Sequence, residues 1–277
     1  MIPRSTRHAV ATLLAAVGTL AAPALAHAAS GASSTSGASG ASGTSGASGG
    51  SGGSGLSPSA SPVSAPGATA SSPLVGNGNA TVTASGAGIT VSSTATALLR
   101  NELTFSGTVP ASDAGDAIEI ERLGHETNWQ WAPTAGSTVA SNGGFSTTWL
   151  TNHIGAFSIR AIVQSASAHA AAVSPALSVI VYLPAVATWY GPGFYGQRLA
   201  CGGRLRHSTL GVANRSLPCG TKVALMFQGR TITVPVVDRG PYANHASWDL
   251  TAATADALRI SGTETIGAAS LRPEPAT

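Results

Sequence analysis

The chain has 277 residues, of which 9% are charged, and its formal net charge is +3. Such a small excess of positive charge argues against nucleic acid as a partner, because proteins that bind nucleic acid usually carry a strongly basic surface. The charge is also uneven. Residues 79–183 hold three basic and six acidic residues, whereas residues 184–277 hold nine basic and five acidic residues, so the C-terminal part is mildly cationic.

Residues 1–28 have the layout of a secretory signal peptide. Arg4 and Arg7 precede an apolar run over residues 9–25, and small residues follow in Ala26-His27-Ala28. The run is broken by a glycine and a proline and lacks a basic flank behind it, so we expect cleavage rather than a retained membrane helix. No later segment is apolar enough to span a bilayer. We therefore expect a secreted, extracellular protein without stable membrane insertion.

Residues 29–78 consist almost entirely of Gly, Ser, Ala, Thr and Pro. Such a sequence cannot bury enough apolar surface to offset the entropy of ordering it, so we predict a disordered linker. As a flexible coil, some 50 residues span roughly 35–42 Å, which gives the linker the reach of a tether.

Residues 79–183 alternate apolar and polar residues in short runs separated by Gly, Asn and Pro, which predicts an all-β sandwich. The expected strands are residues 80–83, 102–107, 117–121, 144–149, 155–163 and 176–181. The strings Leu103-Thr-Phe105-Ser-Gly107 and Gly155-Ala-Phe157 resemble bacterial immunoglobulin-like modules. We interpret Trp129, Trp131 and Trp149 as core or sheet-face residues rather than a platform for carbohydrate.

Residues 184–269 form the predicted second domain, with a flexible tail at 270–277. Residues 221–227 and 231–237 are predicted strands of a hairpin, joined by a turn at Gln228-Gly229-Arg230. Residues 251–260 carry Ala and Leu at helical spacing and end before Ser261-Gly262, so we predict a short helix there.

The chain has two cysteines, Cys201 and Cys219, and both lie in this second domain. In an exported protein such a pair predicts a disulfide, which closes a loop of about 18 residues and stabilises the fold by roughly 3 kcal/mol. A redox or metal-binding pair is the weaker alternative, because the spacing is not Cys-x-x-Cys and no histidine pair stands nearby at ligand spacing.

Four blocks of the second domain have the order and spacing of a known family. They are Ala187-Thr188-Trp189-Tyr190-Gly191, Ser216-Leu217-Pro218-Cys219-Gly220-Thr221-Lys222-Val223, Val236-Val237-Asp238-Arg239-Gly240-Pro241-Tyr242 and Asp249-Leu250-Thr251. They resemble the rare lipoprotein A family, whose fold is a six-stranded double-psi β-barrel shared with expansins. The resemblance implies a cell-wall protein that acts on peptidoglycan. It further implies that active members are lytic transglycosylases, which leave a 1,6-anhydro end, and it implies no metal or organic cofactor.

The resemblance marks two carboxylates and also shows where this chain departs from the family. Asp238 falls on the aspartate of the family's Asp-Arg-Gly-Pro block, and Asp249 falls on the later aspartate. The family's Gly-Glu-x-x-Asp block reads Gly202-Gly203-Arg204-Leu205-Arg206 here, so Gly203 and Arg206 replace both of its carboxylates. Asn214 stands where the family has a histidine.

Glycosidic bond cleavage needs a carboxylic acid that stays protonated near the working pH, and partial burial provides this by raising the pKa. Asp238 is the first candidate for this acid and Asp249 the second. A close guanidinium of Arg239 would lower the pKa of Asp238, the wrong direction for an acid. Both aspartates also have structural alternatives: Asp238 as an acceptor that holds the turn, and Asp249 as a helix cap.

The remaining candidates would bind substrate. Aromatic rings could stack on sugar or pack in the core, and polar side chains could hydrogen-bond to sugar without transferring protons. The predicted substrate-binding residues are Trp189, Tyr190, Tyr195, Arg206, Asn214, Arg239 and Tyr242.

Three functions follow from these observations. The leading hypothesis is a secreted protein that binds and cleaves peptidoglycan glycan strands. The alternative is a non-catalytic, expansin-like binding module, which the missing family carboxylates and histidine favour. A third hypothesis is an adhesive surface protein in which the sandwich carries the function.

Overall fold

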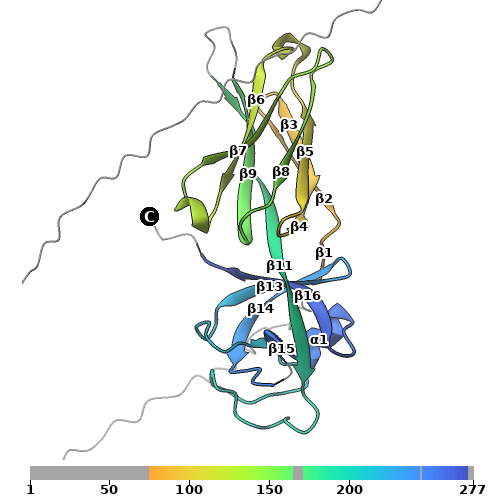
Figure 1. The fold of residues 1–277 in the computed structure, drawn as a ribbon, viewed down its shortest axis with the longest axis vertical. Coiled ribbons are helices and arrows are strands. Elements are labelled where there is room, and N and C mark those ends of the chain that lie inside the picture. Colours follow the sequence, from red (N-terminus) through yellow and green to blue (C-terminus); the bar gives the residue numbers. More distant parts are fainter. Residues whose placement is uncertain (1–74, 165–170, 244, 274–277) are drawn as a thin grey trace, which may run out of the picture. The chain divides into compact units, whose positions relative to one another are not determined.

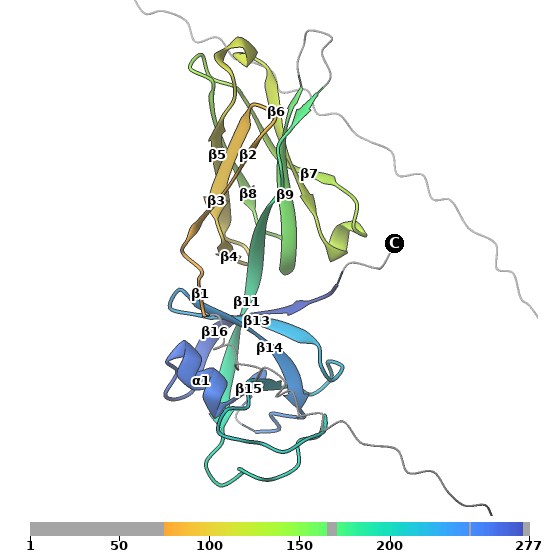
Figure 2. The same ribbon diagram turned by 180° about the vertical axis from the view of Figure 1, so that it is seen from behind.

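The computed structural model describes residues 75–164, 171–243 and 245–273. The expected signal peptide and nearly all of the expected linker lie outside these residues. The described chain is built mainly of strands, as the alternating pattern predicts, and Figures 1 and 2 show it from two opposite sides.

The first module contains two β-sheets. One sheet has the order β2-β3-β5-β8, and in the other β7, β6, β9 and β11 are neighbours, with β10 beside β9 and β4 beside β11. The strands are β2 (Thr81–Gly86), β3 (Ile89–Thr94), β4 (Thr96–Leu98), β5 (Glu102–Thr108), β6 (Ala117–Leu123), β7 (Ala132–Thr138), β8 (Gly144–Leu150), β9 (Gly155–Gln164) and β10 (Ala172–Val173). Two 3₁₀ turns, Ala111–Asp113 and His125–Thr127, connect neighbouring strands.

Alternate residues of these strands form one apolar core between the two sheets. Phe105 of β5 and Phe157 of β9 belong to it, and Trp149 meets the edge of Phe157 with ring centroids 5.4 Å apart. Trp149 is therefore a core residue, as expected. Trp131 is half-buried, with the guanidinium of Arg160 lying 4.1 Å above its ring. Two sheets around one core agree with a sandwich, and the immunoglobulin-like resemblance stays a prediction.

The second module is a closed six-stranded barrel, which confirms the predicted double-psi β-barrel fold. Its strand order is β15-β12-β14-β13-β16-β11, and pairing of β11 with β15 closes it. The pairs β11–β15 and β12–β14 are parallel and the others antiparallel, so the barrel is mixed. Its strands are β11 (Leu177–Tyr190), β12 (Val212–Ala213), β13 (Lys222–Phe227), β14 (Arg230–Asp238), β15 (Trp248–Thr251) and β16 (Glu264–Leu271).

Valine, leucine and isoleucine side chains fill the barrel. Val212, Leu225 and Leu250 are fully buried there, and Leu258 of the helix α1 (Ala252–Leu258) joins the same cluster. The helix predicted over residues 251–260 is thus present but shorter. It ends because Arg259 adopts a left-handed backbone conformation, with φ of 62°.

β11 belongs to both modules. Its residues Leu177–Val181 pair with β9, its residues Leu183–Ala187 pair with β16, and Ala187–Tyr190 pair with β15. Figure 1 accordingly draws it as one continuous arrow. The domain boundary expected at residues 183 and 184 therefore lies inside a strand, where no linker is present.

Both outer boundaries also differ from expectation. The linker was expected to reach residue 78, but β1 (Gly76–Asn77) already pairs with Thr231 and Arg230 of β14. The flexible tail was expected from residue 270, but β16 continues to Leu271. In both places backbone pairing with a barrel strand orders residues whose composition alone carries no signal. The predicted hairpin is confirmed, and its turn has positive φ angles at Gln228 and Gly229.

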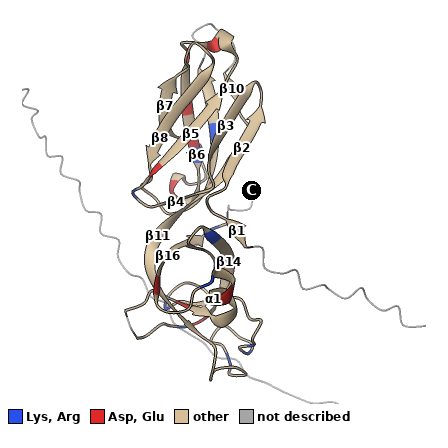
Figure 3. Cartoon of the chain, turned by 90° about the vertical axis from the view of Figure 1, so that its right-hand side faces the viewer, with Lys and Arg blue, Asp and Glu red and all other residues tan. Residues whose placement is uncertain are grey.

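Charged side chains are sparse on the described chain, as Figure 3 shows. None of its helices has the length and apolar character needed to cross a membrane.

Candidate active site on the barrel

Strand register brings the two candidate aspartates onto neighbouring strands. Ala213 of β12 is opposite Asp238 of β14 on one side and opposite Asp249 of β15 on the other. Asp249 is in turn opposite Thr188 of β11. Residues in register across a sheet project to the same face, so Asp249 and Thr188 share one face. The pairing of β12 with β14 shifts register between Val212 and Ala213, and Asp238 is tied to this site by the Tyr190 hydroxyl. A single strand separates the aspartates, which corresponds to roughly 9–10 Å between their Cα atoms.

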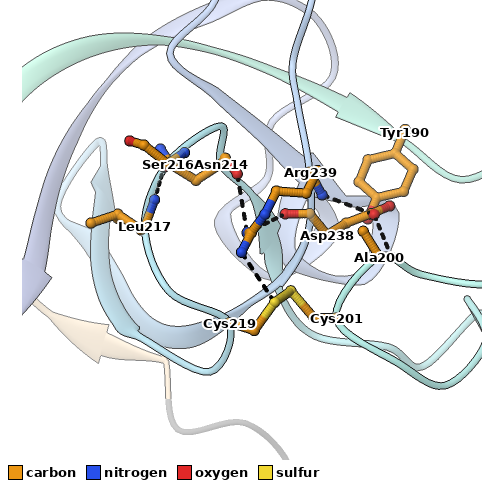
Figure 4. Close-up of a disulfide and its surroundings, with 9 residues drawn as sticks. All are labelled: Tyr190, Ala200, Cys201, Asn214, Ser216, Leu217, Cys219, Asp238 and Arg239. Carbon is orange, nitrogen blue, oxygen red and sulfur yellow. Dashed lines mark hydrogen bonds between the residues drawn. A yellow bond between two sulfur atoms is a disulfide. The ribbon is translucent and has the colours of Figure 1, made fainter. Parts of the chain in front are cut away.

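Backbone donors hold the carboxylate of Asp238. Its Oδ1 accepts hydrogen bonds from the backbone N–H groups of Ala200, at 2.8 Å, and Arg239, at 2.9 Å. Its Oδ2 accepts one from the Tyr190 hydroxyl, at 3.3 Å (Figure 4). The structural role considered for Asp238 is therefore present, because its carboxylate joins the middle of the loop between β11 and β12 to the end of β14. Its second oxygen, Oδ2, contacts the half-exposed Tyr190.

The guanidinium of Arg239 does not pair with the carboxylate of Asp238. It donates instead to the backbone oxygens of Asn214 and Asp238, at 3.3 and 3.4 Å, and contacts Sγ of Cys219 at 3.2 Å. Figure 4 shows it between Asp238 and the disulfide. The expected effect of this cation on its neighbour was based on adjacency in sequence, whereas the side chain is turned toward the disulfide loop.

The environment of Asp249 shifts its pKa upward. Its carboxyl is half-buried, and Oδ1 accepts a hydrogen bond from the Thr188 hydroxyl at 2.8 Å. Burial raises the pKa of Asp249, the Thr188 bond lowers it, and the charge of Asp238 raises it further, so the net shift is upward. The expected alternative of a helix cap is wrong, because Thr251 is the N-terminal cap residue of α1 and no side chain caps it.

The Tyr190 hydroxyl is close to both carboxylates. Burial, followed by the charge of Asp238 and its hydrogen bond and then the charge of Asp249, raises the pKa of the Tyr190 phenol far above its ordinary value. The phenol therefore stays protonated and donates to Asp238. Its ring meets the edge of Phe194 with centroids 6.2 Å apart.

The other aromatic candidates are dispersed. Tyr242 is 79% exposed, so its ring is free to stack on a sugar. Tyr195 stacks on His207 with centroids 3.7 Å apart. Trp189 alternates with Thr188 and Tyr190 along β11, so its side chain projects to the opposite face from the carboxylates. The structure thus brings Tyr190 to the aspartates and does not bring Trp189 there.

The polar candidates divide in the same way. Oδ1 of Asn214 accepts the backbone N–H groups of Ser216 and Leu217, at 3.1 and 2.9 Å, so this oxygen holds a turn. Arg206 is exposed on the loop before β12. The predicted disulfide is confirmed: Cys201 and Cys219 are bonded, with Cα atoms 5.4 Å apart.

Sequence reasoning missed Thr188, Ala200 and His207. Thr188 stands two residues before Tyr190, so strand alternation could have placed both on one face. Ala200 acts through its backbone, which no side-chain pattern reveals. In the described residues, no group of three or more His, Cys, Asp or Glu side chains is arranged to hold a metal ion.

Comparison with known proteins identifies the barrel. Residues 184–269 match the family model described as "Lytic transglycolase". A Synechocystis protein named "Probable endolytic peptidoglycan transglycosylase RlpA" is 42% identical over 77 residues, which are 27% of this chain and 24% of that protein. The Campylobacter jejuni "Endolytic peptidoglycan transglycosylase RlpA" is 37% identical over 75 residues, which are 26% of this chain and 27% of that protein.

A third relative, from Aquifex aeolicus, is 40% identical over 79 residues, which are 28% of this chain and 35% of that protein. The chain thus spans between a quarter and about a third of the length of these curated relatives. A solved structure, "Streptomyces papain inhibitor (SPI)", is 26% identical, covers 32% of this chain and 93% of its own, and has a TM-score of 0.26. Residues 184–269 accordingly form an RlpA-like double-psi β-barrel.

Proposed function

We propose that this barrel binds peptidoglycan glycan strands and cleaves them as a lytic transglycosylase, in a secreted, cell-wall-associated protein. The observation that carries the proposal is the pair Asp238 and Asp249, placed on β14 and β15 with only Ala213 between them. The names of the RlpA relatives support peptidoglycan as the substrate.

The two carboxylates suit different roles. Asp249 is the general acid, because its pKa is shifted upward, which is the direction that a proton donor to the glycosidic oxygen needs. Asp238, held by two backbone N–H groups and Tyr190, stabilises the positive charge of the oxocarbenium-like transition state. This assignment reverses the order in which sequence alone ranks the two residues.

In this reaction no water molecule is consumed, because the sugar's own 6-hydroxyl replaces it. Asp249 donates its proton to the glycosidic oxygen, the bond from that oxygen to the sugar C1 breaks, and its electron pair goes to the leaving oxygen. The 6-hydroxyl of the same sugar bonds to C1 and gives its proton to the Asp249 carboxylate. The products are a new 4-hydroxyl end and a 1,6-anhydro end, and the acid is restored.

The test is digestion of purified peptidoglycan by the full chain, with the products analysed by mass spectrometry. We expect 1,6-anhydro ends from the wild-type protein and a loss of at least about 100-fold in rate for Asp249→Asn, the usual contribution of a general acid. Asp238→Asn should also be slow. Reducing ends would instead indicate hydrolysis. Equal rates for wild type and Asp249→Asn would show that Asp249 is not the general acid.

A second function is favoured by one observation. The loop segment Gly202–Arg206, where the resemblance leads one to expect two carboxylates, contributes none and is mostly exposed. A barrel that lacks these groups could bind glycan strands without cutting them. In that case the wild-type protein would sediment with peptidoglycan and release no products, and Asp249→Asn would bind equally well.

A further inference from the structure

The loop before β12 is folded into a short two-stranded ribbon over residues 196–206. Gly196 N–H donates to Leu205 O at 2.8 Å, and Leu205 N–H donates to Gln197 O at 2.9 Å. Arg198 and Arg204 form an antiparallel bridge and lie directly opposite each other.

One face of this ribbon carries three arginines. Leu199 and Leu205 are buried, whereas Arg198, Arg204 and Arg206 are exposed. Because side chains alternate along an extended chain, the neighbours of a buried leucine point to solvent. Arg204 and Arg206 flank Leu205, and Arg198 is opposite Arg204, so all three project from the solvent side.

These positive charges are not neutralised within the described part of the chain. The ion pairs found there, Arg122–Glu126 and Arg160–Glu121, both lie in the first module. Arg204 donates one hydrogen bond to the backbone oxygen of Gly196, at 2.7 Å, which orients it without cancelling its charge. Like charges directly opposite in a ribbon are destabilising, so this arrangement is unfavourable for folding alone and fits a surface that binds an anion.

The ribbon is attached directly to the candidate active site. Its end carries Ala200, whose N–H binds the carboxylate of Asp238, and Cys201, which is joined to Cys219. The arginines therefore belong to the same loop that holds the carboxylate of Asp238. We propose that this face is a subsite for carboxylates carried by the peptidoglycan strand, which rests on the proposed function and names a chemical feature of its substrate.

Arginine suits such a ligand. Its planar guanidinium matches the two oxygens of a carboxylate and keeps its charge at every physiological pH. Peptidoglycan offers carboxylates from two sources: the stem peptides, and the lactyl group that is uncovered when an amidase removes those peptides. The chemistry is the same, and the two sources differ only in their distance from the sugar.

Binding of the full chain to insoluble peptidoglycan, measured by co-sedimentation, tests the proposal. The variant Arg198→Gln/Arg206→Gln removes two charges and leaves Arg204, which has a backbone partner. The matched control, Arg100→Gln/Arg259→Gln, removes two exposed arginines outside the ribbon. We expect roughly tenfold weaker binding for the ribbon variant, a weaker dependence on salt, and no change for the control.

Chemical treatment of the polymer gives an independent readout. Amidation of its carboxylates with a carbodiimide should lower wild-type binding to the level of the ribbon variant. If amidase-treated strands still bind, the lactyl carboxylate is the ligand; if they do not, the stem peptide is. Equal binding of ribbon variant and wild type, or undiminished binding to amidated polymer, would overturn the proposal. Binding lost only after hydrofluoric acid strips phosphate polymers would overturn it as well.

Failure of this inference can be told apart from failure of the proposed function. Carboxylate-dependent binding without 1,6-anhydro products would contradict the transglycosylase activity and support the carboxylate subsite. If wild type and the ribbon variant cleave intact and amidated polymer equally fast, the enzymatic activity is supported and the carboxylate subsite is contradicted.

Discussion

The Thr188 hydroxyl donates a hydrogen bond to Oδ1 of Asp249 from the directly opposed position on a parallel strand, at 2.8 Å. The position is imposed by strand register, so the two side chains meet without any loop to arrange them. The bond orients the Asp249 carboxyl, and its effect on the pKa opposes that of burial. Thr188 is therefore a positioning residue whose contribution can be measured through pH.

Thr188→Val should extend activity to higher pH. The Thr188 bond lowers the pKa of Asp249, so its removal raises that pKa further, and the protonated acid persists as the pH increases. The unfolding free energy should fall by only about 1 kcal/mol, because valine keeps the shape and the strand preference. Thr188→Ser, which retains the hydroxyl, is the control. An unshifted alkaline limb in the pH–rate profile of Thr188→Val would contradict this role.

Asp249→Asn should reduce the loss of stability with rising pH. The folded-state pKa of Asp249 is above its ordinary value of 3.8, so the folded protein holds this proton more tightly than the unfolded chain does. The stabilisation from this group is complete below that ordinary value and is lost as the pH rises through the raised pKa. Urea unfolding at pH 4 and pH 7 should show a smaller difference for the variant. A larger difference would mean that Asp249 is stabilised as the anion.

Tyr190→Phe should slow the reaction more than it destabilises the fold. It removes the hydroxyl that contacts Oδ2 of Asp238 while keeping the ring against Phe194. We expect a loss of about 1 kcal/mol in stability and roughly a tenfold decrease in kcat, with KM nearly unchanged. Tyr195→Phe is the matched control, since the Tyr195 ring stacks on His207. Equal effects of the two variants on kcat would argue against a role for the Tyr190 hydroxyl.

Removal of the disulfide, by Cys201→Ser/Cys219→Ser, should lower stability by about 3 kcal/mol. For a folded part of this size, that corresponds to a decrease in Tm of roughly 6–12 °C in calorimetry. The activity of the variant should fall too, because Cys201 follows Ala200, which binds Asp238. Reductant should lower the Tm of the wild type and leave that of the variant unchanged; an equal response of both would point to another cause.

Local pattern predicted one hairpin and the helix of the barrel, whereas β12, β15 and β16 were not among the expected strands. The hairpin of β13 and β14 and the helix α1 follow from alternation, turn residues and helical spacing, and both are present. The disulfide follows from two cysteines in one domain. In the first module β3 and β7 were missed. β7 holds only Ala, Pro, Thr, Gly and Ser, which carry little apolar signal, and it is ordered by pairing with β6, whereas β3 does alternate and was overlooked.

The sequence predicted which residues belong to the candidate site, but not how they are arranged in space. Asp238 and Asp249 could be named from the blocks that carry them, but β12, the two-residue strand between them, has no pattern of its own. The direction of the Arg239 side chain likewise depends on where the disulfide loop passes. The upward shift of the Asp249 pKa depends on burial in the finished barrel. These properties arise from long-range pairing, which a single sequence does not display.

The course of β11 bears on how this protein came about. The segment that matches the lytic transglycosylase family model begins at residue 184, in the middle of a strand whose first half is hydrogen-bonded to β9. A recombination breakpoint at the start of this segment would divide β11 between the part that pairs with β9 and the part that pairs with β16. The two modules are therefore expected to be inherited together and to resist separation by limited proteolysis at this junction. In this chain the barrel shares a strand with its neighbour and is not an independently exchangeable domain.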